Sequence, residues 1–377
     1  MAMTRLLFVV SEDWFFVSHR LHLAQTAIQE GFQVALLTRI ADQRAKIEQA
    51  GVTVFDWQLE RGSRNPLLEF KALIGLVRAM RAFRPDLIHA VAMQPVLHAT
   101  AGAWLTGVRR RVLALSGLGF VFSSAKLRAR LLRPPLSAAL RLALNGEHTR
   151  LILQNPDDCR VLVDAKVARP GCIRMIRSSG VDTSVFLPGT GQPSTPLVIL
   201  PGRMLWDKGV GEFVSCARAL KAAKVPARFA LVGDPDLRNP ESVPLARLHQ
   251  WVDEGVVEWW GRRADMPAVL AQADIVCLPS YREGLPLALL EAASCGLPIV
   301  TFDVPGCREA VEHGRTGFLV PFGDQGMLNE AIASLLADES MRRGFGDAGR
   351  DKVLREFTRE RVARETLAVW KEVLGLP

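Results

Sequence analysis

The chain has 377 residues, of which 49% are hydrophobic and 23% are charged, and this globular composition excludes a disordered protein. The length exceeds one typical hydrophobic core and predicts two domains of ordinary size. The net charge is +8, yet residues 1–180 hold 25 basic and 13 acidic residues while the remainder holds 22 and 26. The basic excess therefore belongs to the first half, where it favours an acidic or phosphate-bearing partner.

The N-terminal sequence predicts a buried strand rather than an export signal. Its apolar run, Leu6–Val10, is short and is followed by Ser11-Glu12-Asp13. A longer uncharged stretch, residues 90–108, contains several polar side chains and a proline. It predicts a strand end and a buried helix rather than a membrane span. We therefore expect a cytoplasmic protein. The alternative is a cytoplasmic protein bound at the inner face of the cytoplasmic membrane.

Short apolar strands alternate with helical segments along the first half. The predicted strands are Leu6–Val10, Val34–Leu37, Val52–Trp57, Leu87–His89, Val112–Leu115 and Ile173–Ile176. The predicted helices are His19–Glu30, Asp42–Ala50 and Pro66–Phe83. Such alternation predicts a parallel sheet covered by helices on both faces.

The alternation restarts after a linker around residues 188–194 that is rich in glycine and proline. The predicted strands here are Leu197–Leu200, Phe229–Val232, Val256–Trp259, Ile275–Leu278 and Ile299–Phe302. The fold class is therefore α/β, with two Rossmann-like doubly wound domains that face a central cleft. We place the first domain at 1–182 and the second at 183–357. A final helix within 358–377 is expected to pack back on the first domain.

The loop after the predicted strand Ile275–Leu278 carries the strongest functional signal. Gly284 permits a tight turn, and Pro286 suits the first turn of a helix. The free N–H groups at such a helix end, near Leu285, would bind a diphosphate. Two glutamates lie on either side of this helix start.

Glu283 can accept hydrogen bonds from sugar hydroxyls, and Glu291 from the two hydroxyls of a ribose. Either glutamate alone is better explained as a solvated surface acid. Their spacing around Gly-Leu-Pro, directly after a strand, favours a site.

Two cations follow the first strand of the second domain, in the segment Pro201–Gly209. Arg203 and Lys208 would point toward the same cleft as the helix end. Two cations and a helix N-terminus can neutralise a leaving nucleoside diphosphate without a metal. Ordinary loop cations are the alternative, but their place in the doubly wound pattern favours the site.

Several motifs of the second half occur in a known order. They are Gly202-Arg203…Lys208-Gly209, Leu231-Val232-Gly233-Asp234, Gly261-Arg262-Arg263-Ala264-Asp265, Glu283-x7-Glu291, Pro298-Ile299-Val300…Gly306…Glu309 and Gly314–Val320. Over nearly all of residues 197–325 the chain thus resembles retaining glycosyltransferases of family 4, with the GT-B fold and of the bacterial cell-surface polysaccharide type. The set of motifs is highly specific.

The resemblance implies roles for the residues that match. Arg203 and Lys208 would hold the donor diphosphate, Glu283 would meet the donor sugar as a catalytic residue, and Glu291 would bind the ribose. The resemblance also implies retained anomeric configuration, no metal and no cofactor, because the nucleotide-sugar is a substrate. Asp234-Pro235-Asp236 spells D-x-D, a manganese motif of another glycosyltransferase fold, but it follows a strand here and predicts a turn.

The first domain resembles the family less closely. Many members have a glycine pair after the first strand, whereas this chain has Ser11 in a loop that runs on to Arg20 without a glycine. Arg20 and the N–H groups of the next helix start are the candidates for that contact. His89 matches a histidine that members carry near the reacting sugar. A buried core histidine is nearly as good an explanation.

Gly117 and Gly119 lie in a Ser-Gly-Leu-Gly loop similar to that of members that extend sugars on polyprenyl diphosphates. The following stretch, Lys126–Arg141, interleaves leucines with five cations. It suits either a helix on anionic lipid headgroups or a solvated helix with a buried leucine stripe.

The predicted function is transfer of a sugar from a nucleotide-sugar, with UDP the most frequent base in the family, to an acceptor hydroxyl. The expected acceptor is an oligosaccharide or a polyprenyl-diphosphate-linked sugar, in the synthesis of a cell-surface polysaccharide. The alternatives are a nucleotide-sugar epimerase or phosphorylase on the same fold, or an inactive nucleotide-sugar-binding protein. No nucleic-acid motif is present, so a nucleic-acid partner is not expected.

Overall fold

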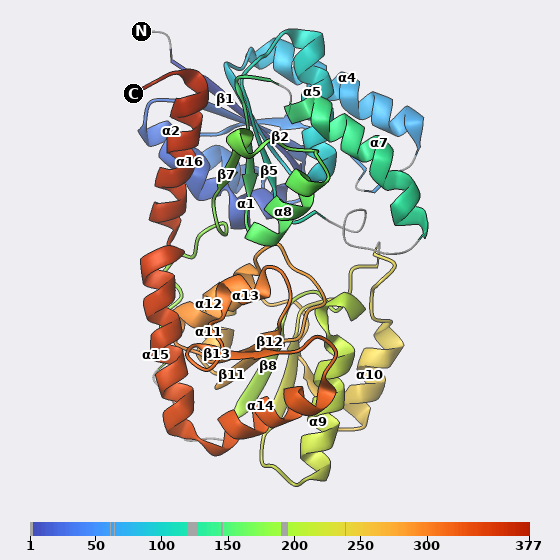
Figure 1. The fold of residues 1–377 in the computed structure, drawn as a ribbon, viewed down its shortest axis with the longest axis vertical. Helices are drawn as coiled ribbons and strands as arrows, with labels where there is room; N and C mark the ends of the chain where they lie inside the picture. Colours follow the sequence, from blue (N-terminus) through green and yellow to red (C-terminus); the bar gives the residue numbers. More distant parts are fainter. Residues whose placement is uncertain are drawn as a thin grey trace. The chain divides into compact units, whose positions relative to one another are not determined.

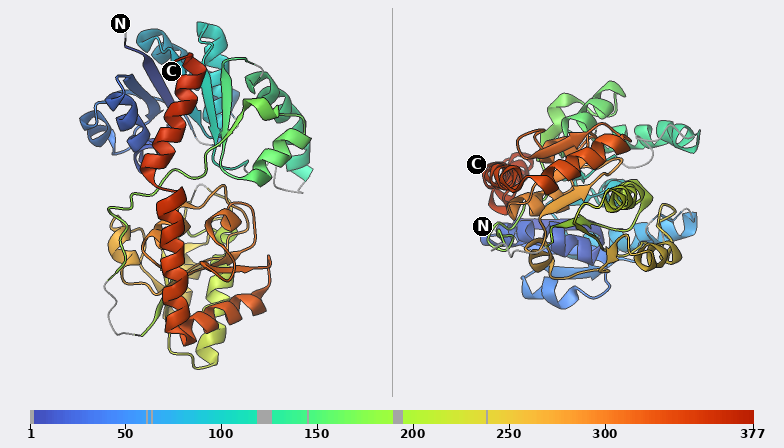
Figure 2. Two further views of the ribbon diagram at one scale, coloured as in Figure 1. Left: turned by 60° about the vertical axis from the view of Figure 1, so that its left-hand side comes forward. Right: turned by 90° about the horizontal axis from the view of Figure 1, so that it is seen from below.

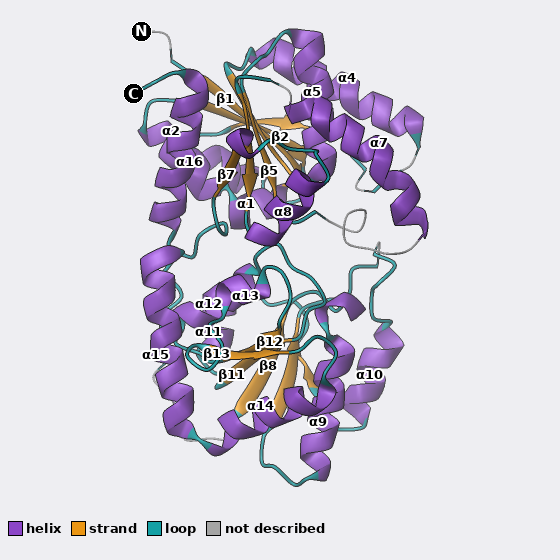
Figure 3. Ribbon diagram, in the orientation of Figure 1, coloured by secondary structure: helices purple, strands orange, loops and turns teal. Residues whose placement is uncertain are grey.

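The structure is a computed structural model that describes residues 3–60, 62–63, 65–118, 127–144, 146–189, 195–237 and 239–377. The chain divides into two compact units. Met1–Gly180 and Glu360–Pro377 form the first unit, and Val181–Arg359 form the second. Each unit contains one parallel sheet with helices on both faces (Figures 1 and 3).

The sheet of the first unit has seven parallel strands in the order β3-β2-β1-β4-β5-β6-β7. The strands are β1 (Arg5–Glu12), β2 (Gln33–Arg39), β3 (Thr53–Asp56), β4 (Leu87–Val91), β5 (Arg111–Leu115), β6 (Thr149–Leu153) and β7 (Ile173–Met175). The order reverses between β1 and β4, so that the loops after these two strands diverge at the carboxyl edge of the sheet. The sequence predicts six of these strands and misses β6.

Alternate residues of β1 face two separate cores. Leu7 and Val9 pack with one set of helices, whereas Leu6, Phe8 and Val10 pack with the other. The first core is covered by α4 (Pro66–Phe83), α5 (Met93–Thr106), α7 (Leu127–Leu144) and α8 (Pro156–Asp164). The second is covered by α1 (Asp13–His19), α2 (Leu21–Gln29), α3 (Arg44–Gln49) and α16 (Arg359–Leu374). The predicted buried helix after the strand at 87–91 is confirmed as α5.

The far end of the chain therefore completes the first unit. Trp370 of α16 is fully buried against Phe8 and Phe32. Its ring centroid lies 5.8 Å from that of Phe8. Figures 1 and 2 show α16 as the last helix of the chain, beside the strands of the first unit.

At the start of the first unit, one sequence prediction is wrong and one helix is missed. Ser11 is expected in a loop, but β1 extends to Glu12 and includes it. The helix predicted over His19–Glu30 is confirmed as α2, but the sequence misses the preceding helix α1, which ends at His19. The cause is Asp13, whose buried carboxylate accepts hydrogen bonds from the backbone N–H groups of Ala41, Asp42 and Gln43 at 2.7, 3.1 and 3.0 Å. These long-range bonds fix the first turn of α1 directly after the strand.

The sheet of the second unit has six parallel strands in the order β10-β9-β8-β11-β12-β13. They are β8 (Leu197–Pro201), β9 (Arg228–Val232), β10 (Glu258–Trp259), β11 (Ile275–Leu278), β12 (Ile299–Phe302) and β13 (Gly317–Val320). The α-helices are α9 (Val210–Ala222), α10 (Leu245–Asp253), α11 (Met266–Leu270), α12 (Leu287–Ser294), α13 (Cys307–Ala310), α14 (Gln325–Ala337) and α15 (Glu339–Glu356). The sequence does not predict β13.

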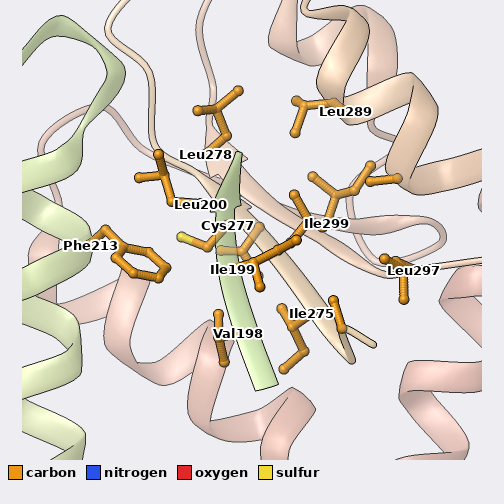
Figure 4. Packing of buried hydrophobic residues seen from close by; sticks show 14 of the residues in the cluster. Val198, Ile199, Leu200, Phe213, Ile275, Cys277, Leu278, Leu289, Leu297 and Ile299 are labelled. Atoms are coloured by element: carbon orange, nitrogen blue, oxygen red, sulfur yellow. The ribbon is translucent and has the colours of Figure 1, made fainter. Parts of the chain in front are cut away.

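The central strands of this sheet are buried on both faces, which explains their continuous apolar sequences. Ile199 of β8 and Ile299 of β12 both align with Val276 of β11, and Cys277 of β11, Phe213 of α9 and Leu289 of α12 belong to the same core (Figure 4). This core holds the carboxyl ends of the strands, and the loops that follow them, in fixed positions. The doubly wound two-domain fold is confirmed, while a cleft shared by the two domains stays a prediction.

Within the described parts of the chain, no helix combines the length and hydropathy that crossing a membrane requires.

Candidate functional site

Four loops meet at the carboxyl edge of the second sheet. Backbone hydrogen bonds join the loops after β8 and β9 (Met204 N to Asp234 O, 3.0 Å), after β11 and β8 (Tyr281 N to Asp207 O, 2.9 Å), and after β11 and β12 (Glu283 N to Pro305 O, 3.3 Å). The loop after β11 is thus fixed on two sides. It carries the Glu-Gly-Leu-Pro segment that the sequence singles out.

Two glycines allow these loops to approach each other. Gly209 has φ +74°, and a Cβ there would lie 2.1 Å from the carbonyl oxygen of Pro279. Gly306 has φ +83°, and a Cβ there would lie 2.5 Å from the carbonyl oxygens of Glu283 and Gly284. Only glycine combines a left-handed backbone with such close contacts. The two positions therefore fix where Glu283 lies.

Lys208 and Glu283 form an ion pair between two of these loops. Lys208 is the last residue of the short helix η2 (Trp206–Lys208), and its Nζ donates to Oε1 of Glu283. Ser280 Oγ donates to the same carboxylate oxygen at 2.7 Å. The two side chains are 20% and 12% exposed, so the pair is shielded from water but open on one side. The carboxylate is held in one orientation beside a cation.

Arg203 belongs to the same group of charges. Its guanidinium pairs with Asp236 at 2.7 Å. Asp207 lies between the charged residues: burial raises the pKa of its carboxyl, Lys208 and Arg203 oppose that rise, and Glu283 adds to it. The structure thus brings Arg203, Lys208 and Glu283 together.

Both aspartates of the D-x-D sequence make contacts within the protein. Asp234 Oδ1 accepts a hydrogen bond from the backbone N–H of Arg262 at 3.0 Å, and Asp236 pairs with Arg203. Among the described residues, no group of three or more His, Cys, Asp or Glu side chains is placed to hold a metal ion. The role of Asp236 as the partner of Arg203 is missed by the sequence analysis, which assigns it only to a turn.

The helix α12 begins directly after the Glu-Gly-Leu-Pro segment. Its first residue is Leu287, so Pro286 precedes the first turn instead of lying within it. Gly284, Leu285 and Pro286 are buried, and among the described residues no side-chain capping bond from the N-cap position, Pro286, is present. The uncapped N–H groups and the helix dipole suit an anionic ligand.

Glu291 lies further along α12 and is half-buried. Burial raises the pKa of its carboxyl to about 7, and Arg359 opposes this rise. None of the hydrogen bonds between described residues involves the Glu291 carboxylate. The structure therefore places Glu291 on the predicted helix, outside the Lys208–Glu283 ion pair.

On the first unit, His89 lies in β4 and is 1% exposed. Trp370 Nε1 donates a hydrogen bond to its Nδ1 at 2.9 Å, and Phe8 stacks on its ring. Burial, with a smaller contribution from the Arg20 charge, lowers the pKa of His89 to about 3, so the ring is neutral at physiological pH. Because an indole N–H is only a donor, Nδ1 must be the acceptor and the proton must be on Nε2.

A small cavity of about 10 Å³ lies beside His89, and Arg20, Gln154 and Ser178 also line it. His89 Nε2 and Arg20 Nε are buried without a hydrogen-bond partner among the described residues. Arg20 Nη1 donates to Ser179 Oγ and to the His19 carbonyl, each at 2.9 Å, and burial lowers the pKa of Arg20 to about 10. The space corresponds to about one water molecule. Arg20 and His89 thus share an interior polar site.

The lining of this cavity does not include Ser11 or Gly117. Ser11 is in β1, and Gly117 follows β5 with φ +135°. Gly119 lies outside the described residues. The sequence misses Trp370, which carries no local signal for a contact with a strand near residue 89.

The basic stretch at 126–141 becomes α7, although Lys126 itself lies outside the described residues. Leu140 is buried in the core, whereas Leu131 and Leu132 are 68% and 50% exposed. Arg141 donates to the carbonyls of Lys166 and Ala165 at 2.7 and 2.8 Å. Leu140 fits the predicted buried leucine stripe, whereas contact of this stretch with lipid headgroups stays a prediction.

Comparison with known proteins gives two family matches, one within each unit. The family described as "Glycosyl transferase 4-like" matches residues 5–155, and "Glycosyl transferases group 1" matches residues 195–338. Together they span most of the chain.

One curated relative matches along most of its length. It is the N,N'-diacetylbacillosaminyl-diphospho-undecaprenol alpha-1,3-N-acetylgalactosaminyltransferase of Campylobacter jejuni, 27% identical over 342 residues, which are 87% of this chain and 88% of the relative. The alpha-maltose-1-phosphate synthase of Mycolicibacterium smegmatis is 28% identical over 226 residues, which are 54% of this chain and 58% of that one.

Among solved structures, a sucrose-phosphate synthase from Thermosynechococcus elongatus has a TM-score of 0.79 at 20% identity, with 99% of each chain covered. Anabaena HepE in complex with UDP has a TM-score of 0.75 at 19% identity, covering 98% of this chain and 100% of that one. At these identities the likeness establishes the fold.

Proposed function

This chain belongs to the glycosyltransferases of the group 1 and 4-like families and has the GT-B fold, and from that premise we propose that it transfers a sugar from a nucleotide-sugar donor to an acceptor hydroxyl. The observation that supports the site most directly is the Lys208–Glu283 pair beside the uncapped start of α12. In the proposed complex, Lys208, Arg203 and the N–H groups at the start of α12 together bind the donor diphosphate. A diphosphate bound there would place its sugar next to Glu283.

In this arrangement each residue has a separate task. Arg203 and Lys208 stabilise the negative charge that develops on the leaving nucleoside diphosphate, without a metal in that role. Glu283, oriented by Lys208 and Ser280, accepts hydrogen bonds from donor-sugar hydroxyls. Glu291 accepts from the ribose hydroxyls.

We propose that transfer retains the anomeric configuration. The acceptor oxygen bonds to the anomeric carbon as the bond from that carbon to the diphosphate oxygen breaks. The acceptor proton passes to the departing diphosphate on the same face, so no protein nucleophile is needed. Glu283, whose Oε1 is already held by Lys208 and Ser280, serves here as an orienting acceptor.

The proposed donor is a UDP-sugar, and a similar fold has been solved with UDP in Anabaena HepE. The proposed acceptor is a polyprenyl-diphosphate-linked sugar, because the Campylobacter relative is named for an undecaprenol-diphosphate-linked acceptor and matches over most of its length. The basic excess of the first half and the outward Leu131 and Leu132 of α7 suit an acceptor held at the cytoplasmic face of a membrane. Synthesis of a cell-surface polysaccharide is the proposed context.

A donor screen tests the proposal. The protein is incubated with a panel of nucleotide-sugars and a membrane lipid extract, and the lipids are analysed by mass spectrometry. We expect a sugar-sized mass increase on one lipid-linked species with one donor. Conversion of the donor without lipid would indicate an epimerase, and a sugar phosphate formed with inorganic phosphate would indicate a phosphorylase. Saturable donor binding without any product across the panel would indicate a binding protein and overturn the proposed activity.

A further inference from the structure

The first unit has a large surface hollow at the edge opposite its carboxyl-end loops. Its volume is about 760 Å³, and it lies at the amino ends of β4, β5 and β6. Ligands of doubly wound sheets bind at the carboxyl ends of the strands, so this hollow is separate from the expected substrate region. Its volume is within the range of small-molecule sites.

The charges that line the hollow are almost all positive. They come from Arg81, Arg84, Arg109 and Arg110, and His148 adds a titratable ring. The carboxylate of Asp86 is the only acidic group among the lining residues, and it already accepts from the Arg5 backbone N–H at 2.8 Å and pairs with the Arg5 guanidinium at 3.8 Å.

These four arginines differ from most others on the protein. Within the described chain, their guanidinium groups make no hydrogen bond or ion pair. By contrast, Arg150 and Arg174 both pair with Glu372 on the same unit. Four unpaired guanidinium groups around one hollow repel each other, and a bound anion would relieve that repulsion.

The backbone of Arg84 supports a role for its side chain. Arg84 ends α4 in the left-handed conformation, with φ 53° and ψ 61°. Glycine is the usual residue at such a helix end, because a side chain is disfavoured in the left-handed conformation. The left-handed backbone gives no local reason for an arginine here, and the residue lies on the wall of the hollow.

The walls of the hollow are fixed by the sheet. Asp86 N donates to Arg5 O at 2.8 Å, Ile88 N to Arg110 O at 3.1 Å, and Arg111 N to His148 O at 3.0 Å. The segments that carry the arginines are thus joined to one another through backbone bonds. A ligand would meet positions that are already organised.

We propose that this hollow is a binding site for phosphate groups, distinct from the donor site on the second unit. Arginine forms paired hydrogen bonds to phosphate oxygens, and several guanidinium groups can bind one phosphate or diphosphate. The phosphate belongs to a lipid headgroup or to a soluble phosphate compound. Trp104 and Leu105, each 60% exposed, lie in the last turn of α5 directly before the hollow, where an apolar contact with lipid would form.

Titration calorimetry with inorganic pyrophosphate tests the site on the full chain. Saturating UDP is present, so that the proposed donor site is filled. The double variant Arg109→Gln/Arg110→Gln should bind pyrophosphate at least tenfold more weakly than the wild type. A control that removes two exposed cations of α3, Arg44→Gln/Lys46→Gln, should bind as the wild type does. Equal affinity in the two double variants, or no saturable binding by the wild type, would overturn the proposal.

The variant Arg84→Gly separates binding from folding. Glycine suits the left-handed backbone, so the melting temperature should stay equal or rise while pyrophosphate affinity falls. Unchanged affinity in this well-folded variant would count against the site.

Sedimentation with vesicles distinguishes the two sources of phosphate. Phosphatidylcholine vesicles are compared with vesicles that also contain phosphatidylglycerol. If the source is lipid, the wild type co-sediments with the anionic vesicles, pyrophosphate releases it, and Arg109→Gln/Arg110→Gln binds them poorly. If the source is soluble, the variants lose pyrophosphate affinity but sediment with vesicles as the wild type does. Variants that match the wild type in both assays would refute phosphate binding at the hollow.

Discussion

Lys208 and Glu283 come from loops after two different strands, and their side chains meet in an ion pair that Ser280 completes from the same carboxylate oxygen. The pair is partly shielded from water, which strengthens the attraction relative to a fully exposed pair. It fixes the carboxylate and keeps a cation next to the uncapped start of α12. The cation and the carboxylate are thus arranged before any ligand arrives.

Replacing either member of this pair should remove transfer while leaving the fold intact. Lys208→Ala deletes a charge proposed to stabilise the leaving group, and losses of one such group are typically about 100-fold to 1000-fold in kcat. Glu283→Ala should have an effect of similar size. Steady-state kinetics and a thermal melt measure the two properties separately. Arg218→Ala, which breaks an exposed pair with Glu254 on the same unit, is the control and should leave kcat unchanged. Near-normal rates in both site variants would refute the assignment.

Gly306→Ala should disturb the donor site through the backbone. The added Cβ would lie 2.5 Å from the carbonyl oxygens of Glu283 and Gly284, so the loop that carries Glu283 must move. We expect donor affinity to fall at least tenfold by calorimetry. Gly323→Ala is a matched control, because Gly323 has a similar φ of +79° but no atom within 4 Å of the added Cβ. If both variants lose the same affinity, the backbone angle and not the contact is responsible.

Donor binding should release protons near neutral pH. Burial raises the pKa of Glu291 to about 7, and hydrogen bonds from ribose hydroxyls to the carboxylate would lower it. At pH 7 the wild type should then release up to about half a proton for each UDP-sugar bound. Calorimetry in two buffers of different ionisation enthalpy measures this number. Glu291→Gln should bind without that release, and equal release by the variant would show that another group titrates.

The same carboxyl predicts how stability depends on pH. Its folded pKa lies above the ordinary value of 4.5, so the protonated form stabilises the fold. That contribution is complete below pH 4.5 and is lost as pH rises through about 7. The melting temperature of Glu291→Gln relative to the wild type should therefore increase between pH 5 and pH 8.

Trp370→Phe should loosen the first unit at His89. The phenyl ring keeps most of the apolar contact but cannot donate to His89 Nδ1, which is left buried and unpaired. We expect a loss of about 1–3 kcal/mol in the free energy of unfolding. Urea denaturation measures it, with Trp104→Phe on the exposed face of α5 as control. Nitrogen NMR of His89 should show the proton on Nε2 in the wild type and a changed tautomer balance in the variant. Unchanged stability and tautomer would refute this role of Trp370.

The sequence predicts well those strands and helices whose own residues carry the pattern that identifies them. The strands β8, β11 and β12 are buried on both faces, so their apolar runs suffice to identify them. Strand β6 is missed because it contains Arg150, whose charge is balanced by Glu372 on α16, far along the chain. The separate helix α1 is missed for the same kind of reason, since Asp13 is held by the backbone of residues 41–43.

The site residues also divide into those that a local sequence pattern identifies and those that only distant contacts define. Arg203, Lys208 and Glu283 are found from their positions after strands, and the structure brings them together. Their neighbours Ser280 and Asp236 are missed, because only the folded loops bring these side chains to them. Trp370 acts on His89 across 281 residues of sequence, and no periodic pattern predicts such a contact.

The return of α16 to the first unit limits how this protein can be made. During synthesis on the ribosome, residues 1–180 emerge first, but the helix that covers Phe8, Phe32 and His89 emerges only after the whole second unit. Until α16 has been synthesised, the face of the first unit that contains Phe8 and Phe32 therefore stays partly exposed to water. Cleavage of the chain between the two units would leave α16 held on the first unit by noncovalent contacts alone, so the packing of residues 1–180 depends on a helix from the opposite end of the chain.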